Sequence, residues 1–248
     1  MAQHFELSIV IPCFNEENRL DLAPFTRFLK NEPSVLICFV NDGSSDNTFG
    51  LLQQYQKEFP TQIEVISTEK NGGKAEAVRT GFLYCSTTFE YTKIAYLDAD
   101  LATTLEECLE LSAFVSDKIP FAFGSRIPKI GNDIQRKKHR FYVGRLIAAF
   151  ISWQLELDVY DTQCGCKIFT KQLSDKLFVE KFISKWLFDV ELFHRAIQLL
   201  GKENMASMCK EIPLKKWVDQ GESKVKMTYF FKLWFDLLSI RNTYKRTH

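Results

Sequence analysis

The sequence predicts an α/β fold with a mainly parallel central sheet flanked by helices, and three observations lead to this prediction. Short, continuous apolar runs of strand length recur in the first part of the chain. Stretches of helical length separate these runs. Polar clusters stand directly after the second and fourth runs. Strands that alternate with helices in this way indicate βαβ units and a parallel sheet.

The expected elements follow one another with clear turn signals. In chain order they are strand 7–12, helix 19–31, strand 35–40, helix 48–59, strand 63–67, helix 74–86 and strand 93–97. The polar segment 41–46 separates the second strand from its helix, and the glycine-containing segment 71–73 separates the third. Ligands of such sheets bind beyond the carboxyl ends of the strands. We therefore expect the functional site at Asp42, Asp98 and Asp100, which follow two of these ends.

The composition limits the class of protein. The chain has 248 residues, of which 46% are hydrophobic and 25% charged, as in an ordinary globular domain. The formal net charge of +1 argues against nucleic acid as a partner. The 7 cysteines are an odd set without repeated spacing, which favours reduced thiols in a cytosolic protein. We expect no integral membrane segment, because no stretch reaches the ~18 apolar residues of a span and no signal-peptide pattern is seen.

The charge is unevenly distributed, which points to a surface with a special role. Basic residues clearly outnumber acidic ones in 118–145 and again in 210–248. Apolar helical stretches at 141–157 and 227–240 accompany these basic segments. Such helices can lie in a membrane interface, or they can be core helices with one solvated edge. We expect a catalytic domain at 1–225 and an amphipathic helix at 226–248, peripheral on the cytoplasmic face of a membrane.

The segment Asp98-Ala99-Asp100 is the clearest chemical signal. Mg²⁺ prefers one or two carboxylates together with phosphate oxygens. Two carboxylates one residue apart at a strand end can therefore hold a divalent cation, Mg²⁺ or Mn²⁺, against a diphosphate. A cation in this position would neutralise charge on a departing nucleoside diphosphate.

The four motifs 8–17, 40–48, 71–74 and 98–100, taken in this order, resemble the nucleotide-sugar half of the inverting GT-A glycosyltransferases of family 2. The resemblance implies the GT-A fold and a UDP-sugar donor. It places Asp100 on the metal, Asp98 beside the ribose and the metal, and Lys74 near the nucleotide. It also implies a nucleotide site formed by Pro12, Phe14, Glu16, Asp42, Gly73, Lys74 and Asp98.

Motifs in the second half are similar to the polyprenyl-phosphate branch of that family. They are 123–126, 140 with 144–145, 161–165, 186–191 and 221–224. The resemblance implies a polyprenyl phosphate as acceptor, with Arg126, Arg140 and Lys224 binding its phosphate. The segment 161–165 and Ala102 favour the glucosyl form of the branch over the mannosyl form. The expected reaction transfers a hexose to the lipid phosphate with inversion, giving a β-linked product.

The chemistry of the acceptor leaves a rival interpretation open. A phosphate monoester is already anionic near neutral pH and needs cations, whereas a sugar hydroxyl needs a carboxylate base. Asp189 or Glu191 would supply that base if the protein builds a glycan on a soluble acceptor. These residues are two apart on a predicted helix, so only one can face the site. A third interpretation is a nucleotide-sugar binding protein without catalytic activity.

Overall fold

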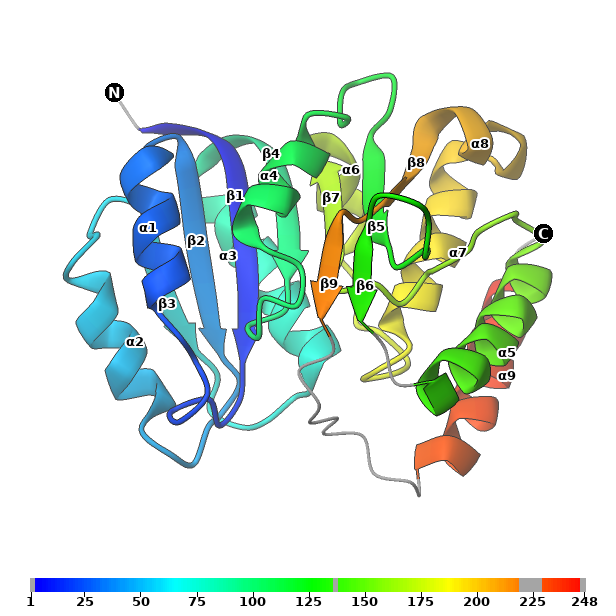
Figure 1. Ribbon diagram of the computed structural model, residues 1–248, viewed down its shortest axis with the longest axis horizontal. Helices are drawn as coiled ribbons and strands as arrows, with labels where there is room; N and C mark the ends of the chain where they lie inside the picture. Colours follow the sequence, from blue (N-terminus) through cyan, green and yellow to red (C-terminus); the bar gives the residue numbers. More distant parts are fainter. Residues whose placement is uncertain (1–2, 136–137, 219–228, 246–248) are drawn as a thin grey trace.

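The computed structural model describes residues 3–135, 138–218 and 229–245. A seven-stranded sheet with the order β3-β2-β1-β4-β7-β5-β8 runs through its centre (Figure 1). Its strands are β1 His4–Cys13, β2 Val35–Asn41, β3 Ile63–Ser67, β4 Glu90–Leu97, β5 Phe121–Ser125, β7 Cys166–Thr170 and β8 Cys209–Pro213. A separate two-stranded sheet pairs β6 Asp133–Gln135 with β9 Lys216–Val218 in parallel.

The direction of the strands confirms a mainly parallel sheet. Strands β3, β2, β1 and β4 pair in parallel, and so do β5 and β8. Only β7 runs against its neighbours, and it lies between β4 and β5. Because β7 bridges the two parallel groups, the chain that leads into it crosses the carboxyl end of β4, where the candidate site lies.

Helices cover both faces of the sheet and bury two apolar cores (Figure 1). The helices α1 and α4 pack over one face, where alternate side chains of β1 and β2 such as Ile9 and Phe39 form a core. The helices α3, α6 and α7 pack on the other face. The helices are α1 Ala23–Asn31, α2 Thr48–Gln56, α3 Lys74–Thr88, α4 Leu105–Ser112, α5 Lys138–Leu155, α6 Lys171–Leu177, α7 Phe188–Leu200, α8 Met205–Met208 and α9 Tyr229–Lys245.

The first helix begins later than the sequence predicts. It starts at Ala23 rather than near residue 19. The carbonyl of Glu16 accepts hydrogen bonds from the backbone N–H groups of Arg19 and Leu20, so this segment forms a turn at the pocket edge. Asp21 then accepts a hydrogen bond from the N–H of Ala23 at 3.0 Å, which satisfies one of the unpaired donors at the helix start.

The last helix packs against the domain through one of its faces. Leu237 and Ile240 of α9 are fully buried, and Gln154 of α5 donates a hydrogen bond to the carbonyl of Leu237 at 3.2 Å. Phe235 and Leu238 point outward, with 74% and 45% of their surface exposed. The predicted apolar face is thus divided between the core and the surface. Within the described residues, no helix is both long and apolar enough to cross a bilayer.

Candidate active site

A pocket of about 420 Å³ lies at the carboxyl ends of β1, β2 and β4, where the sequence predicts the site. It brings together eight residues predicted from sequence: Pro12, Phe14, Glu16, Asp42, Gly73, Lys74, Asp98 and Asp100. A second hollow of about 630 Å³ adjoins it on the side of α1 and α4 and shares Glu16, Arg19, Ala99 and Asp100 with it. The carboxyl ends of the parallel strands thus border one pocket, as expected for this class of sheet.

Asp42 organises the pocket wall through backbone contacts. Its side chain is almost fully buried at the end of β2. One carboxylate oxygen accepts the N–H of Gly72 and the other accepts the N–H of Gly73, both at 2.8 Å. Gly73 has a φ of +89°, a conformation that side-chain-bearing residues rarely adopt. Asp42 therefore fixes the turn that leads into α3 and places Lys74 at the start of that helix.

Lys74 joins α3 to the two aspartates after β4. Its ammonium group lies 2.5 Å from Asp98. Burial would lower the pKa of Lys74, but the charges of Asp98 and Asp189 outweigh it and raise the pKa, so the side chain is cationic. Burial and the neighbouring charge of Asp98 both raise the pKa of Asp100. Two carboxylates are thus crowded together at one edge of the pocket.

The donor set at this edge fits a divalent cation. Asp98 and Asp100 supply two carboxylates beside an open pocket, the arrangement in which Mg²⁺ or Mn²⁺ completes its coordination with phosphate and water oxygens. The part of the chain that the structure describes contains no group of three or more His, Cys, Asp or Glu side chains that could enclose a metal. A cation bound by Asp98 and Asp100 would take its remaining ligands from phosphate and water oxygens.

The position of Asp98 is set by a glycine from a distant segment. Gly165 precedes β7, and its backbone lies so close to Asp98 that a Cβ atom at this position would overlap the carboxylate. On the other side of the motif, Leu101 has a φ of +48°, which is unfavourable for a branched side chain. Its N–H donates to the carbonyl of Asp98 at 3.1 Å. The contact with Gly165 and the hydrogen bond of Leu101 both restrict the backbone conformation of residues 98–101.

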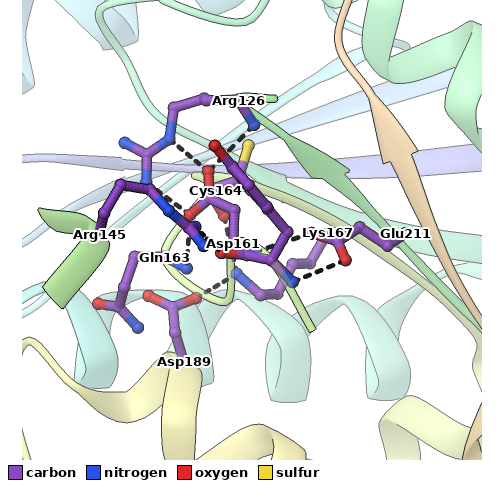
Figure 2. A network of polar contacts seen from close by, with 9 residues as sticks. Arg126, Arg145, Asp161, Gln163, Cys164, Lys167, Asp189 and Glu211 are labelled. Carbon is purple, nitrogen blue, oxygen red and sulfur yellow. Dashed lines mark hydrogen bonds and ion pairs between the residues drawn. The ribbon is translucent and has the colours of Figure 1, made fainter. Parts of the chain in front are cut away.

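Arg126 extends the site from the end of β5. Its Nε and Nη2 atoms donate to the two carboxylate oxygens of Asp161 at 2.6 and 2.7 Å (Figure 2). Burial would raise the pKa of Asp161, but the guanidinium of Arg126 outweighs it and holds that pKa well below its usual range. Because a guanidinium carries five N–H donors, this pair leaves three of them for a ligand. Trp217 faces the guanidinium with its ring centre at 5.2 Å.

Asp189, the first candidate base, is held in an ion pair. Its Oδ1 atom accepts from Lys167 at 2.6 Å and also from the hydroxyl of Tyr96. Lys167 is fully buried within β7, and it also donates to the carbonyl of Cys164 at 2.7 Å. Lys167 and the hydroxyl of Tyr96 thus both occupy the Oδ1 atom of Asp189. Figure 2 shows this contact together with the Arg126–Asp161 pair.

Glu191, the second candidate base, lies away from the pocket. Its Oε1 atom accepts from Arg195 at 2.8 Å and from the hydroxyl of Tyr244 at 2.9 Å, and its Oε2 atom accepts from the N–H of Ile183. The predicted division of Asp189 and Glu191 between two helix faces is confirmed, and Glu191 belongs to the docking of α9 on α7.

Two acceptor-side residues predicted from sequence are not described in full. Arg140 lies in α5, but its side chain is not described, and Lys224 lies outside the described residues. Two further pocket residues, Lys185 and Trp186, have no predicted role. The loop before α7 brings them to the pocket, where the carbonyl of Lys185 accepts from the N–H of Ala75 at 3.3 Å. Trp186 belongs to the motif 186–191 found in the sequence, whereas no sequence motif included Lys185.

Comparison with known proteins agrees with this geometry. The family described as Glycosyl transferase family 2 matches residues 8–178. A dolichyl-phosphate β-glucosyltransferase of Trichomonas vaginalis is 30% identical over 247 residues, covering 94% of this chain and 70% of the relative. The human dolichyl-phosphate β-glucosyltransferase is 28% identical, covering 92% of this chain and 77% of the relative.

A solved structure shares the fold. The glucosyl-3-phosphoglycerate synthase of Mycobacterium tuberculosis, in complex with Mn²⁺, UDP and glucosyl-3-phosphoglycerate, superposes with a TM-score of 0.67 at 16% identity. The match covers 96% of this chain and 80% of that structure. The predicted GT-A fold is thereby confirmed. The family match spans most of the chain and includes the four motifs 8–17, 40–48, 71–74 and 98–100, so the chain belongs to glycosyl transferase family 2 and is a glycosyltransferase.

Proposed function

We propose that this glycosyltransferase moves glucose from UDP-glucose to a polyprenyl phosphate of the dolichyl type and inverts the anomeric centre. The observation that carries the choice of acceptor is the state of the two candidate bases. Asp189 is ion-paired with the buried Lys167, and Glu191 is paired with Arg195 outside the pocket. A hydroxyl acceptor would need a carboxylate positioned to take its proton, whereas a phosphate acceptor needs none. The names of the relatives support the same acceptor.

On the donor side, we assign the nucleotide to the pocket lined by Pro12, Phe14, Glu16, Asp42 and Gly73. Lys74, cationic beside Asp98, is suited to the negative charge of the diphosphate. Asp100, with Asp98 beside it, would hold Mg²⁺ or Mn²⁺, which stabilises the diphosphate as a leaving group. Lys185 adds a further cation at the rim of the same pocket.

On the acceptor side, we assign the lipid phosphate to Arg126, together with Arg140 and Lys224. The three guanidinium N–H groups that Asp161 does not engage are suited to phosphate oxygens. A phosphate oxygen attacks C1 of glucose as the bond from C1 to the β-phosphate oxygen of UDP breaks. The products are UDP and a β-glucosyl phosphodiester, and no proton needs to be removed from the acceptor.

A lipid acceptor also gives a reason for the surface formed by α5 and α9. Tyr142, Leu146 and Trp153 of α5 are exposed by 70%, 69% and 58%. Phe235 of α9 is exposed by 74%. We propose that this face docks the protein on the cytoplasmic side of a membrane, with the neighbouring basic residues attracted to anionic lipids.

The test is a transfer assay on the purified protein. UDP-glucose labelled in the sugar is incubated with Mn²⁺ and one of three acceptors in detergent: dolichyl phosphate, dolichol or 3-phosphoglycerate. We expect an acid-labile, chloroform-soluble product with dolichyl phosphate only. Asp100→Ala should abolish it. Arg126→Lys should raise the KM for dolichyl phosphate, because a lysine cannot keep the two-point contact with Asp161 and bind phosphate as well.

Other outcomes of this assay would redirect the proposal. Product with 3-phosphoglycerate alone would exclude the lipid acceptor, and the position of the glucose, on the hydroxyl or on the phosphate of that compound, would decide between the two mechanisms. Product with dolichol, lost in Asp189→Asn, would establish attack by a hydroxyl group instead. Binding of UDP-glucose without turnover on any acceptor would contradict the proposed reaction.

A further inference from the structure

Glu211 makes a pair of contacts with the segment that contains Asp161, the partner of Arg126. It lies on β8, where it is in register with Phe123 of the neighbouring β5. Its carboxylate accepts two consecutive backbone N–H groups, that of Tyr160 at 2.9 Å and that of Asp161 at 2.8 Å (Figure 2). One oxygen serves each donor, so both ends of the carboxylate are engaged by one short segment of backbone.

Tyr160 and Asp161, whose backbone N–H groups Glu211 binds, each bind an arginine. Asp161 binds the guanidinium of Arg126 with both oxygens and also accepts the backbone N–H of Arg126 at 3.1 Å. Tyr160 binds Arg145 of α5 twice, because its carbonyl accepts from Nη1 at 2.7 Å and its ring centre lies 3.5 Å from the guanidinium carbon. Two cations from different elements therefore meet at residues 160–161.

From this arrangement we infer that Glu211 is a positioning residue for the acceptor phosphate. It fixes the backbone of residues 160–161, and this backbone sets the orientation of Arg126 and Arg145. This inference rests on the proposed function, in which Arg126 binds that phosphate. Only an acceptor at both ends can serve two adjacent N–H groups, so an ionised glutamate fits and a glutamine does not.

The expected consequence is specific to one substrate. Glu211→Gln directs an amide NH₂ at one of the two backbone N–H groups and leaves that donor unpaired. The loss of one such bond corresponds to about tenfold in an equilibrium constant. We expect the KM for dolichyl phosphate to rise about tenfold or more, while the KM for UDP-glucose stays within about twofold. The donor pocket is lined by other residues.

The matched control is Glu64→Gln. Glu64 is also a partly buried glutamate on a strand, and it accepts a hydrogen bond from Tyr84 at 3.2 Å at the opposite edge of the sheet. This control should change neither KM. If Glu211 acts through Arg126, then adding Glu211→Gln to Arg126→Lys should raise the acceptor KM by less than about twofold. If Glu211→Gln acted only by a general loss of folding, it would have the same effect in the wild type and in Arg126→Lys.

A second readout does not depend on the acceptor. Phenylglyoxal modifies accessible arginines, and peptide mass spectrometry reports its rate at Arg126 and Arg145. We expect Glu211→Gln to raise both rates severalfold, with Glu64→Gln unchanged. Glu211→Asp, which keeps the charge but is too short to reach both donors, should give an intermediate rate. It also serves as the test variant if the glutamine variant does not fold.

The two proposals can fail separately. A wild-type protein that transfers no glucose to dolichyl phosphate would overturn the proposed function, and the modification rates would still decide on Glu211. Unchanged modification rates in both Glu211 variants, or an unchanged acceptor KM in an active enzyme, would overturn the positioning role.

Discussion

At the level of single residues, the site depends on close contacts between segments that are far apart in sequence. Gly165 touches the carboxylate of Asp98 so closely that no side chain fits between them. The side chain of Asp98 is 39% exposed, so it can swing away without disturbing the core. A methyl group at position 165 should therefore damage the site and spare the fold.

We predict that Gly165→Ala lowers the affinity for UDP-glucose in the presence of Mn²⁺ by about tenfold or more, because Asp98 leaves its place beside Asp100. Calorimetric titration with UDP-glucose and Mn²⁺ measures this affinity. Gly50→Ala is the matched control, since a Cβ atom there would likewise meet a flexible polar side chain, that of Asn47, away from the pocket. Unchanged affinity in Gly165→Ala would show that the contact is unimportant for donor binding.

The Arg126–Asp161 pair should make stability depend on pH. The pKa of Asp161 is lower in the folded protein than the value of about 3.9 in an unfolded chain, so its ionised form favours folding. Its stabilising effect is complete above the unfolded pKa and is lost as the pH falls through the folded pKa. Asp161→Asn should destabilise the protein by about 2–4 kcal/mol at pH 7, because it leaves a buried guanidinium without its charge partner.

Urea unfolding at several pH values tests this prediction. The difference between the wild type and Asp161→Asn should be largest from pH 5 to pH 7 and should shrink below about pH 4. Asp175→Asn is the control, because Asp175 forms an exposed ion pair with Lys171 at 3.5 Å that should contribute little. A difference that stays constant down to pH 3 would mean that the charge of Asp161 plays no part.

At the level of elements, the helices α5 and α9 combine a buried face with an exposed apolar face. Leu237 and Ile240 anchor α9 to the core, whereas Phe235 faces outward, as does Trp153 of α5. If this outer face binds lipid, Phe235→Ser and Trp153→Ser should each lower binding to vesicles of phosphatidylcholine and phosphatidylserine by roughly tenfold.

Sedimentation with vesicles measures this binding, and the melting temperature should change little because both side chains are exposed. Phe114→Ser is the control, since Phe114 is 41% exposed at the end of α4. Equal vesicle binding by all three variants and the wild type would contradict membrane docking through this face.

Local sequence patterns predict the elements of the first half well, because each strand there is a continuous apolar run that ends in polar residues. The strand β3, for example, has the predicted bounds 63–67. The strand β7 is not predicted by this pattern. Its second residue is Lys167, which would be expected at the surface but is buried and paired with Asp189, a residue of a helix later in the chain.

The residues of the site are likewise predictable from the sequence only in part. Its donor side was predictable, since the ends of parallel strands meet at one edge whatever the details of packing. The pairing of Arg126 with Asp161 was not, because the two residues are brought together only when β7 inserts between β4 and β5. The contact of Gly165 with Asp98 depends on the same insertion. The late start of α1 reflects local turn bonds at Glu16 that compete with the helical pattern.

At the level of the whole molecule, the fold divides the chemistry between two groups of strands. The pocket assigned to the donor lies at the ends of β1, β2 and β4. Arg126 follows β5, and Glu211 of β8 accepts the backbone N–H of its partner Asp161. The reversed strand β7 lies between these groups, and the segment before it contacts Asp98 through Gly165 and Arg126 through Asp161. This segment therefore links the residues assigned to the donor with those assigned to the acceptor.

The central claim is that a phosphate oxygen of a polyprenyl phosphate attacks the sugar directly and inverts its anomeric centre. The most direct measurement is the ³¹P and ¹H NMR spectrum of the product formed from UDP-glucose and dolichyl phosphate. We predict a phosphodiester signal coupled to the anomeric proton of a β-glucosyl residue. A phosphate monoester signal that remains unchanged, or an α-linked product, would contradict the account.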